Sequence, residues 1–385
     1  MAFGSKAVIG LDIGSRVVKA IQLKKTGRGL ELERFGTSDV IPGGDSSGAS
    51  QQNMRDLKIA AVRRALESAK ISAKYAVTAV SGESIIVRYI QLPDMPEAEL
   101  KQALRWEAEE YIPFHIDEVN LDSVVLGQAG GSAAGKVDVL LVSAKRDLVS
   151  EHVDIVRSAG LQPVIVDVES FAFLNCFEAN YSPSLSDCVA LVNIGAEITN
   201  INIYVGGTSR FSRDIGIAGD TITTAVQTKA NVPWAKAEET KIALGAPMAQ
   251  KQQEEEGDSS LIDTIRGTVE KLTGEDLGDD SPEGLAGKAI RQSLNNLIGE
   301  VRRSIQFFEN QAAGTPVQRV MLGGGGSRMA RIKDYFSTEL NLPVEILDPL
   351  RAVTVSGREI DTTLLEAQKE YLGVGIGLAL RKVVD

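Results

Sequence analysis

The fold follows from the stretch Val8-Ile9-Gly10-Leu11-Asp12-Ile13-Gly14-Ser15 and from its second copy, Val189-Ala190-Leu191-Val192-Asn193-Ile194-Gly195-Ala196. In each copy an apolar run ends in Asp or Asn, then Ile-Gly and a small residue, and a second apolar run follows. Apolar runs of this length bounded by glycine predict buried strands. Glycine lets the backbone approach a ligand and present its N–H groups to anionic oxygens. Two such loops facing each other would clamp a polyphosphate.

Composition sets limits on the class of protein. The chain has 385 residues, enough for two domains of ~100–200 residues each. Its 41 basic and 52 acidic residues give a net charge of −11, which argues against non-specific nucleic-acid binding and against unaided adhesion to anionic membranes. We see no signal peptide and no apolar run of the ~18–20 residues that a membrane span needs. We therefore expect a cytoplasmic protein without direct membrane insertion.

Cysteine and histidine are too sparse for metal or disulfide chemistry. There are two cysteines, Cys176 and Cys188, and no C-x-x-C pair, so neither a zinc site nor a disulfide framework is expected. Cys176 lies in an apolar run and is expected to be a buried structural thiol.

The order of the periodic segments predicts an α/β protein with an insertion. A βαββα block is expected from strands at 85–92, 119–126 and 136–143 and helices at 97–111 and 146–159. Further along, an acidic segment at 251–287 is expected to be a long loop or mobile tip with some helix near 261–272, and 288–311 a periodic helix. The segment 366–380 is expected to be a closing helix, broken or tightly packed at Gly373, Gly375 and Gly377. The expected division is 1–83 and 161–188 for the first domain, 84–160 for the inserted subdomain, 189–219 and 312–349 for the second domain, 220–311 for its helical subdomain, and 350–385 for a return to the first domain.

A glycine-rich turn provides a third candidate element. Gly323 to Gly326 follow a strand and precede a helix, a context that suits nucleotide binding at a helix N-terminus. It is not the dinucleotide fingerprint, because the third glycine would fall on Arg328, and no Walker A loop is present. A purely structural turn is an equally good interpretation of these glycines.

Taken in order, five segments resemble the superfamily of actin, hexokinase and the heat-shock chaperones. They are the phosphate motifs at 9–19 and 193–199, the connecting helices at 167–172 and 371–380, and the adenosine motif at 320–327. The stretch 237–241 also resembles the A-E-x-x-K segment of bacterial actins. The resemblance implies an actin-like ATPase fold of duplicated ribonuclease H-like domains, with ATP and Mg²⁺ as cofactors.

The resemblance also implies roles for individual residues. Asp12 would hold Mg²⁺ through water, and Glu169 would orient the attacking water. Lys19 would supply a positive charge, and Glu238 and Lys241 would contact the ribose and base. The expected nucleotide-binding set is Gly10, Asp12, Gly14, Ser15, Lys19, Asn193, Gly195, Ala196, Glu197, Thr199, Glu238, Lys241, Gly323, Gly324, Gly325 and Ser327. Structural alternatives remain open: Asp12 capping a turn, Glu169 capping a helix, and Lys241 solvated.

The second phosphate motif departs from the superfamily pattern, which has aspartate where this chain has Asn193. An amide binds a metal cation more weakly than a carboxylate does. The substitution therefore favours a slow or switch-like ATPase.

Within the superfamily, the chain most resembles the PilM family, the FtsA-like proteins of type IV pilus assembly. The resemblance rests on 9–15, the Leu92-Pro93 step, 106–114, 166–169 and 214–216. It implies a cytoplasmic protein held at the inner membrane by partners. These would be the N-terminal cytoplasmic tail of a PilN-like membrane protein, bound in a groove beside the inserted subdomain, and other pilus assembly proteins. The structural alternative is that Trp106 and Phe114 belong to the subdomain core.

Two other functions remain open on the same clamp. A small-molecule kinase of the sugar-kinase type needs a substrate pocket, which the sequence does not reveal. An FtsA-like filament protein usually ends in a basic amphipathic membrane helix, and the segment 378–385 is shorter than such an anchor.

Overall fold

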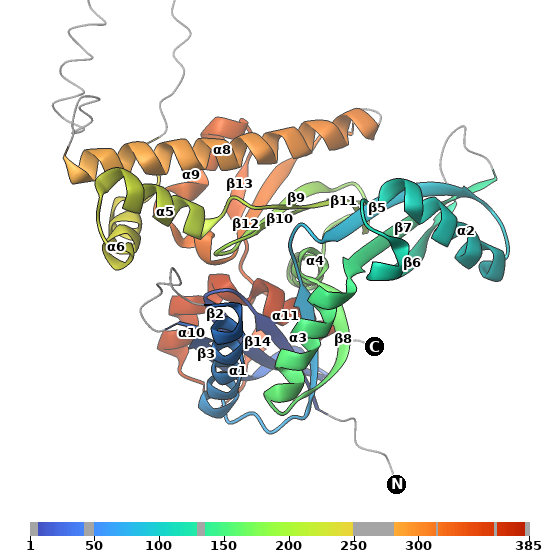
Figure 1. The fold of residues 1–385 in the computed structure, drawn as a ribbon, viewed down its shortest axis with the longest axis horizontal. Coiled ribbons are helices and arrows are strands. Elements are labelled where there is room, and N and C mark those ends of the chain that lie inside the picture. Colours follow the sequence, from blue (N-terminus) through green and yellow to red (C-terminus); the bar gives the residue numbers. More distant parts are fainter. Residues whose placement is uncertain are drawn as a thin grey trace, which may run out of the picture.

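The computed structural model describes residues 7–41, 50–128, 135–248, 281–312, 315–357 and 360–381 (Figure 1). The predicted acidic loop at 251–287 therefore lies, up to residue 280, outside the described residues. No helix within these ranges is long and apolar enough to span a bilayer.

Two sheets repeat one topology. The first has the order β14 (Val353–Val355), β3 (Gly29–Asp39), β2 (Val17–Thr26), β1 (Val8–Ile13), β4 (Tyr75–Val80) and β8 (Gln162–Val168). The second has the order β11 (Thr208–Ile215), β10 (Thr199–Val205), β9 (Cys188–Ile194), β12 (Arg319–Gly323) and β13 (Val344–Ile346). In both, the strand carrying the motif pairs antiparallel with the next strand and parallel with a later one. The predicted duplication is thus confirmed.

Two helices join the sheets. α4 (Glu169–Tyr181) and α11 (Gly373–Leu380) lie between the domains, and their apolar side chains share one core with residues of both sheets (Figure 1). The helices cross closely, because a Cβ added at Gly377 would lie 1.7 Å from the carbonyl oxygen of Ala172. This crossing fixes the floor of the cleft between the domains.

The closing helix differs from its prediction at 366–380. The structure has α10 (Thr362–Gln368), then a 3₁₀ turn over Lys369–Leu372, and only then α11. The helix thus begins earlier than predicted, at Thr362, and the break expected at Gly373, Gly375 or Gly377 lies just before the first of these glycines. Tyr371, within the turn, thereby lines the interdomain cavity.

The inserted block forms a sheet of its own, with the order β5 (Ile85–Pro93), β7 (Lys136–Lys145) and β6 (Val119–Gln128). Helix α2 (Glu97–Tyr111) covers it through Leu100, Leu104 and Ala108. Trp106 is 75% exposed, so the expectation that it belongs to the core was wrong. Phe114 packs partly against this core.

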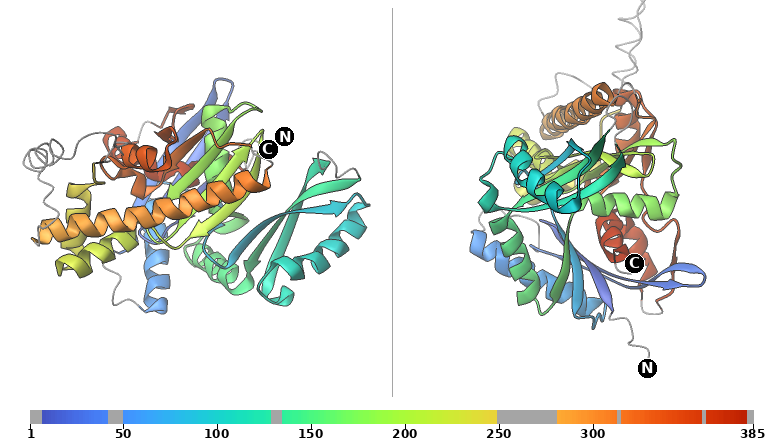
Figure 2. Two further views of the ribbon diagram at one scale, coloured as in Figure 1. Left: turned by 90° about the horizontal axis from the view of Figure 1, so that it is seen from above. Right: turned by 90° about the vertical axis from the view of Figure 1, so that its right-hand side faces the viewer.

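Helix α3 (Arg146–Ser158), predicted within the inserted block, packs on two parts of the molecule. Its Leu148 and Val149 lie against a cluster that includes Val87 and Ala144 of the inserted sheet. The helix also contacts α1 (Gln51–Ser68) and β8 and places Ile155 and Val156 in the core of the first domain. The part that projects from the first domain is therefore the three-stranded sheet with α2, which lies beyond one end of α8 (Figure 2).

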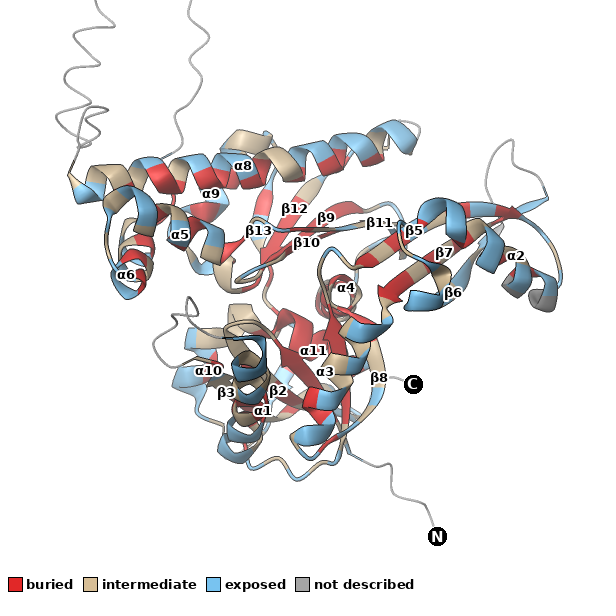
Figure 3. Ribbon diagram, in the orientation of Figure 1, coloured by how far each residue is buried: buried red, intermediate tan, exposed pale blue. Residues whose placement is uncertain are grey.

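The second sheet is covered by helices of its own domain. They are α5 (Gly219–Ala230), α6 (Trp234–Leu244), α8 (Pro282–Gln311) and α9 (Ile332–Leu340). Buried segments alternate with exposed ones along α8 (Figure 3). Its buried face contains the side chains expected to point inward: Ile290, Leu294, Leu297, Ile298, Val301 and Ile305.

Candidate functional site

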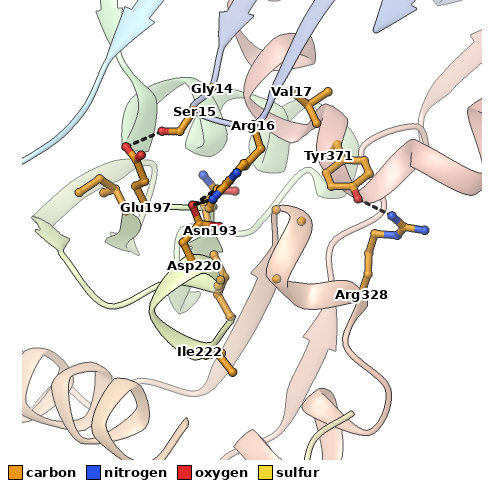
Figure 4. Close-up of a pocket in the computed structure, with 18 of the residues that line it drawn as sticks. Gly14, Ser15, Arg16, Val17, Asn193, Glu197, Asp220, Ile222, Arg328 and Tyr371 are labelled. Carbon is orange, nitrogen blue, oxygen red and sulfur yellow. Dashed lines mark hydrogen bonds and ion pairs between the residues drawn. The ribbon is translucent and has the colours of Figure 1, made fainter. Parts of the chain in front are cut away.

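A cavity of about 310 Å³ lies between the two domains. Its wall is built from the turn after β1, the turn after β9, the starts of α5 and α9, the inner faces of α6 and α8, and the glycine turn after β12 (Figure 4). The two copies of the sequence motif thus line one cavity from opposite domains. Of the predicted set, Asp12, Gly14, Ser15, Lys19, Glu169, Asn193, Gly195, Ala196, Glu197, Glu238, Lys241, Gly324 and Gly325 line it.

The first motif ends in a buried ion pair. Asp12 is 5% exposed, and Lys19 lies opposite it on β2. Lys19 Nζ is 3.0 Å from Asp12 Oδ2. The register of the hairpin therefore places an acid and a base side by side at the cavity wall.

The second motif ends in a neutral counterpart of this pair. Asn200 lies opposite Asn193, and Asn193 Nδ2 donates to Asn200 Oδ1 over 2.9 Å. Asn200 Nδ2 in turn donates to Asp214 Oδ1 over 2.8 Å, and Asp214 Oδ2 accepts from the amide of Gly82 over 2.6 Å. An amide network occupies the position where the first domain has charges, and it reaches back to the first domain.

Glu169 is the carboxyl group with the most unusual environment. It is the first residue of α4, and Val168 is the N-cap, so the capping interpretation of Glu169 was wrong. Burial, followed by the negative charges of Asp12 and Asp214, raises the pKa of Glu169 to about 8. A hydrogen bond from Ser81 and the charge of Lys19 act in the opposite direction. A carboxyl group with a pKa near neutrality suits proton transfer at a reacting water.

Side chains of the first loop bridge the cleft. Ser15 Oγ donates to Glu197 Oε2 over 2.7 Å. Arg16 Nε and Nη2 lie 2.8 Å and 2.7 Å from Asp220 Oδ2 (Figure 4). The Arg16 guanidinium also lies 4.6 Å from the centre of the Trp234 ring.

The opposite end of the cavity combines a polar and an apolar wall. Lys241 Nζ is 2.7 Å from Glu238 Oε2 and 2.9 Å from Thr223 Oγ1. Lys241 is thus buried and paired, which rules out the solvated alternative. The apolar wall is formed by Ile242, Leu294, Leu297, Met329 and Ile332. Such a wall, with a few convergent polar groups, is typical of sites for small molecules.

An aromatic group and a cation face each other at the rim. The guanidinium of Arg328 lies 4.8 Å from the centre of the Tyr371 ring and donates to its hydroxyl group (Figure 4). Stacked pairs of this kind offer a flat surface to a planar ligand.

Four predicted site residues lie outside the cavity wall. A Cβ at Gly10 would lie 2.2 Å from the Gly375 oxygen, so the lack of a side chain at Gly10 allows α11 to pack closely against β1. Gly323 packs on the ring of Phe173. Thr199 Oγ1 donates to the Ile217 oxygen, and Ser327 Oγ donates to the Gly324 oxygen. These residues shape the site without facing it.

The amide of Gly195 differs from expectation too. It donates to the Ile198 oxygen over 3.0 Å inside its own turn, so it is not available to a phosphate in this conformation. The glycine is needed because a Cβ there would lie 2.6 Å from the same oxygen. Ala196 and Glu197 at the tip of the turn are the remaining donors of this loop that line the cavity.

Sequence reasoning missed several residues that shape the site: Arg16, Ser81, Asp214, Gly219, Asp220, Arg328 and Tyr371. Arg16 had a usable signal, since it directly follows the first loop. Asp220 had one too, because Gly216 to Asp220 interrupts the strand pattern just before a helix. Ser81 and Tyr371 had none, because only the tertiary fold brings them to the cavity.

Comparison with known proteins adds the family. The family model for "Type IV pilus assembly protein PilM" matches residues 10–253. The chain belongs to the PilM family. A model for "Cell division protein FtsA" matches residues 190–364. A solved structure of a PilM-PilN type IV pilus biogenesis complex superposes with a TM-score of 0.76 and 28% identity, covering 98% of each chain. The fold is that of the actin-like ATPases.

Curated relatives are FtsA proteins. That of Buchnera aphidicola is 27% identical over 215 residues, which cover 54% of this chain and 48% of the relative. That of Helicobacter pylori strain J99 is 25% identical, and 47% of it is covered. The chain thus spans about half the length of these two relatives. The FtsA of Pseudomonas aeruginosa is 23% identical, over 89% of this chain and 82% of the relative.

Proposed function

We propose that this protein is an ATP-binding scaffold of the type IV pilus inner-membrane assembly complex. The observation that carries the proposal is that equivalent loops of two duplicated domains line a single cavity. Membership of the PilM family supports the pilus context. The protein would lie in the cytoplasm, peripheral to the inner membrane, through contacts with a PilN-like protein and other assembly proteins.

The residues of the cavity fit a magnesium nucleotide. The tips of both turns would face the β- and γ-phosphates, and Glu238 with Lys241 would face the ribose. Asp12 would supply a carboxylate oxygen near Mg²⁺, which retains several waters when bound with phosphates, and Glu169 would orient the attacking water. Bound Mg²⁺ would screen the charge that develops during phosphoryl transfer. Because Asn193 replaces the second carboxylate with a neutral amide, we expect at most slow hydrolysis.

Replacing Asp12 with alanine tests nucleotide binding. We expect the wild type to bind Mg-ATP in titration calorimetry, and Asp12→Ala to bind at least tenfold more weakly, because it removes the metal-facing carboxylate and leaves Lys19 unpaired. Asp56→Ala is the matched control, since Asp56 lies on α1 with an exposed side chain. Absence of binding by the wild type would contradict the proposal.

A second cavity fits the proposed tail-binding groove. It measures about 1050 Å³ and lies between β5 of the inserted sheet, β11 of the second domain and the end of α8. Tyr111, Phe211 and Phe307 provide apolar surface. Both strands are the outermost of their sheets within the described residues. Such strands favour an extended peptide held by main-chain hydrogen bonds and side-chain pockets.

The charges of this groove specify the peptide further. Arg88, Arg210, Arg213 and Arg303 line it, against the acids Glu83 and Asp214. Arg210 and Arg213 are paired, with Asp138 and Glu300. Arg303 is exposed and also pairs with Glu300, and Arg88, which donates to the Val87 oxygen, is exposed. We therefore propose that the tail carries apolar anchors together with acidic or neutral residues.

Truncating Phe307 tests the groove. Phe307 is 53% exposed, and its ring lies tilted against that of Phe211, with the ring centres 5.9 Å apart. We expect Phe307→Ala to weaken binding of a fluorescent PilN-like N-terminal peptide about tenfold in an anisotropy titration, because loss of an aromatic anchor costs ~1–2 kcal/mol. Leu185→Ala, an exposed apolar control at 82%, should bind as the wild type does. Equal affinities of all three proteins would place the tail elsewhere.

A further inference from the structure

Arg16 belongs to the first domain but makes its contacts with the second. Its Nε and Nη2 both lie within 2.8 Å of Asp220 Oδ2 at the start of α5, and its guanidinium lies against Trp234 at the start of α6. The Arg16 and Asp220 side chains are 19% and 20% exposed. An ion pair sheltered to this degree is screened less by salt than a surface pair.

One nitrogen of this guanidinium has no partner. Arg16 Nη1 is buried, and no hydrogen-bond acceptor for it occurs among the residues that the structure describes. A buried charged donor without an acceptor is costly. Because Arg16 also lines the cavity beside Gly14 and Ser15, an anion in the cavity would supply the missing acceptor.

We propose that Arg16 is a phosphate-binding residue that couples nucleotide occupancy to closure of the cleft. This proposal rests on the proposed ATP site. Nη1 donates to a phosphate oxygen while Nε and Nη2 hold Asp220. The bound nucleotide then stabilises the bridge between the domains. By thermodynamic reciprocity, the bridge also stabilises the bound nucleotide.

The coupling predicts how fast nucleotide leaves. A side chain that spans the cleft must release Asp220 or the phosphate before the domains separate. Loss of the bridge should therefore raise the dissociation rate of Mg-ATP. Lysine keeps the charge at position 16 but cannot reach an anion and Asp220 with a planar fork. Arg16→Lys should thus resemble Arg16→Ala.

Tryptophan fluorescence provides a readout independent of catalysis. The chain has two tryptophans, and Trp106 is exposed on α2, so Trp106→Phe leaves Trp234 as the single reporter. In this background we expect Mg-ATP to change Trp234 emission. In a stopped-flow chase, Arg16→Ala, Arg16→Lys and Asp220→Asn should each release Mg-ATP at least tenfold faster. The double variant Arg16→Ala/Asp220→Asn should be no faster than the single variants.

Two controls separate the outcomes. Arg28→Ala, at an exposed arginine in the turn after β2, should leave the release rate unchanged. Thermal unfolding checks that each variant is folded. If the wild type binds Mg-ATP and the Arg16 variants release it at the wild-type rate, the coupling role is wrong while the ATP site stands. If the wild type binds no nucleotide, both are wrong.

Discussion

At the residue scale, the two motifs differ in charge at one equivalent pair. Asp12 faces Lys19 in the first hairpin, and Asn193 faces Asn200 in the second, and in both the partners are seven positions apart in the sequence. One domain thus presents a carboxylate to the cavity, and the other presents amides tied to Asp214. This asymmetry is the physical basis for expecting the metal at Asp12 and not at Asn193. The acidic residues of the second domain at the cavity wall are held by other partners: Glu197 by Ser15, Asp220 by Arg16 and Glu238 by Lys241.

Glu169 provides a prediction about pH at the same scale. Its pKa is raised from 4.5 to about 8 in the folded protein, so the folded state binds the proton more tightly than the unfolded state does. Stability is therefore lost as pH rises from the unfolded value through the folded one. The variant Glu169→Gln has no ionisable group at this position, so its free energy of unfolding does not fall in this way as pH rises. We expect it to match the wild type near pH 4 and to be more stable by up to ~3 kcal/mol at pH 8.

Thermal unfolding across this pH range measures the effect. The gap in melting temperature between Glu169→Gln and the wild type should widen from acid to mildly alkaline pH. A gap that is constant or narrows would mean that Glu169 ionises normally in the folded protein.

At the element scale, the crossing of α4 and α11 sets the spacing of the domains. Gly377→Ala places a methyl group against the backbone of Ala172, which cannot move without shifting α4. We expect a loss of ~2–4 kcal/mol in the free energy of unfolding, measured by urea titration. Gly287→Ala on α8 is the matched control, because a Cβ there meets nothing within 4 Å. It should be neutral or stabilising by up to ~1 kcal/mol. Equal changes in the free energy of unfolding for Gly377→Ala and Gly287→Ala would show that α4 and α11 can move apart without loss of stability.

Elements with strong local signals could be predicted from the sequence. The strand at 85–92 and the helix at 97–111 are confirmed, since Pro93 and Pro113 mark their ends and the apolar period is clear. The closing helix at 366–380 was predicted with a break at its glycines, but the place of the break, at 369–372, depends on tertiary packing around Tyr371. α3, predicted within the inserted block, packs on the sheet of that block through Leu148 and on the core of the first domain through Ile155, and chain order alone does not reveal the second contact.

The residues of the candidate site also fall into those with a local sequence signal and those that depend on tertiary contacts. Asp12, Asn193 and their glycines lie in a repeated local pattern, so both loops could be predicted from the sequence alone. Asp214 and Asp220 lie in segments that the sequence marks, but their partners across the domain boundary, Gly82 and Arg16, could not be predicted from local sequence. Gly10 and Thr199 were assigned to the ligand although they support the loops from behind.

At the scale of the whole molecule, the described parts of the two domains meet at several places, three of which bear on the cavity and the groove. α4 and α11 join them at the floor of the cleft, Ser15 and Arg16 bridge it beside the cavity, and β5 contacts β11 near the second groove. Asp214 belongs to the amide network of Asn193 and also lines the groove at β11. A movement of the domains at the cavity would therefore also displace Asp214 at the groove. Such coupling is consistent with the proposed scaffold, whose binding to a partner would depend on whether nucleotide is bound.

Hydrogen–deuterium exchange with and without saturating Mg-ATP tests directly whether both loops hold one ligand. We predict slower exchange in two separate peptides, one containing Gly14 to Arg16 and the other containing Ala196 and Glu197, at the same nucleotide concentration. Protection of one loop alone, or of neither, would contradict the account.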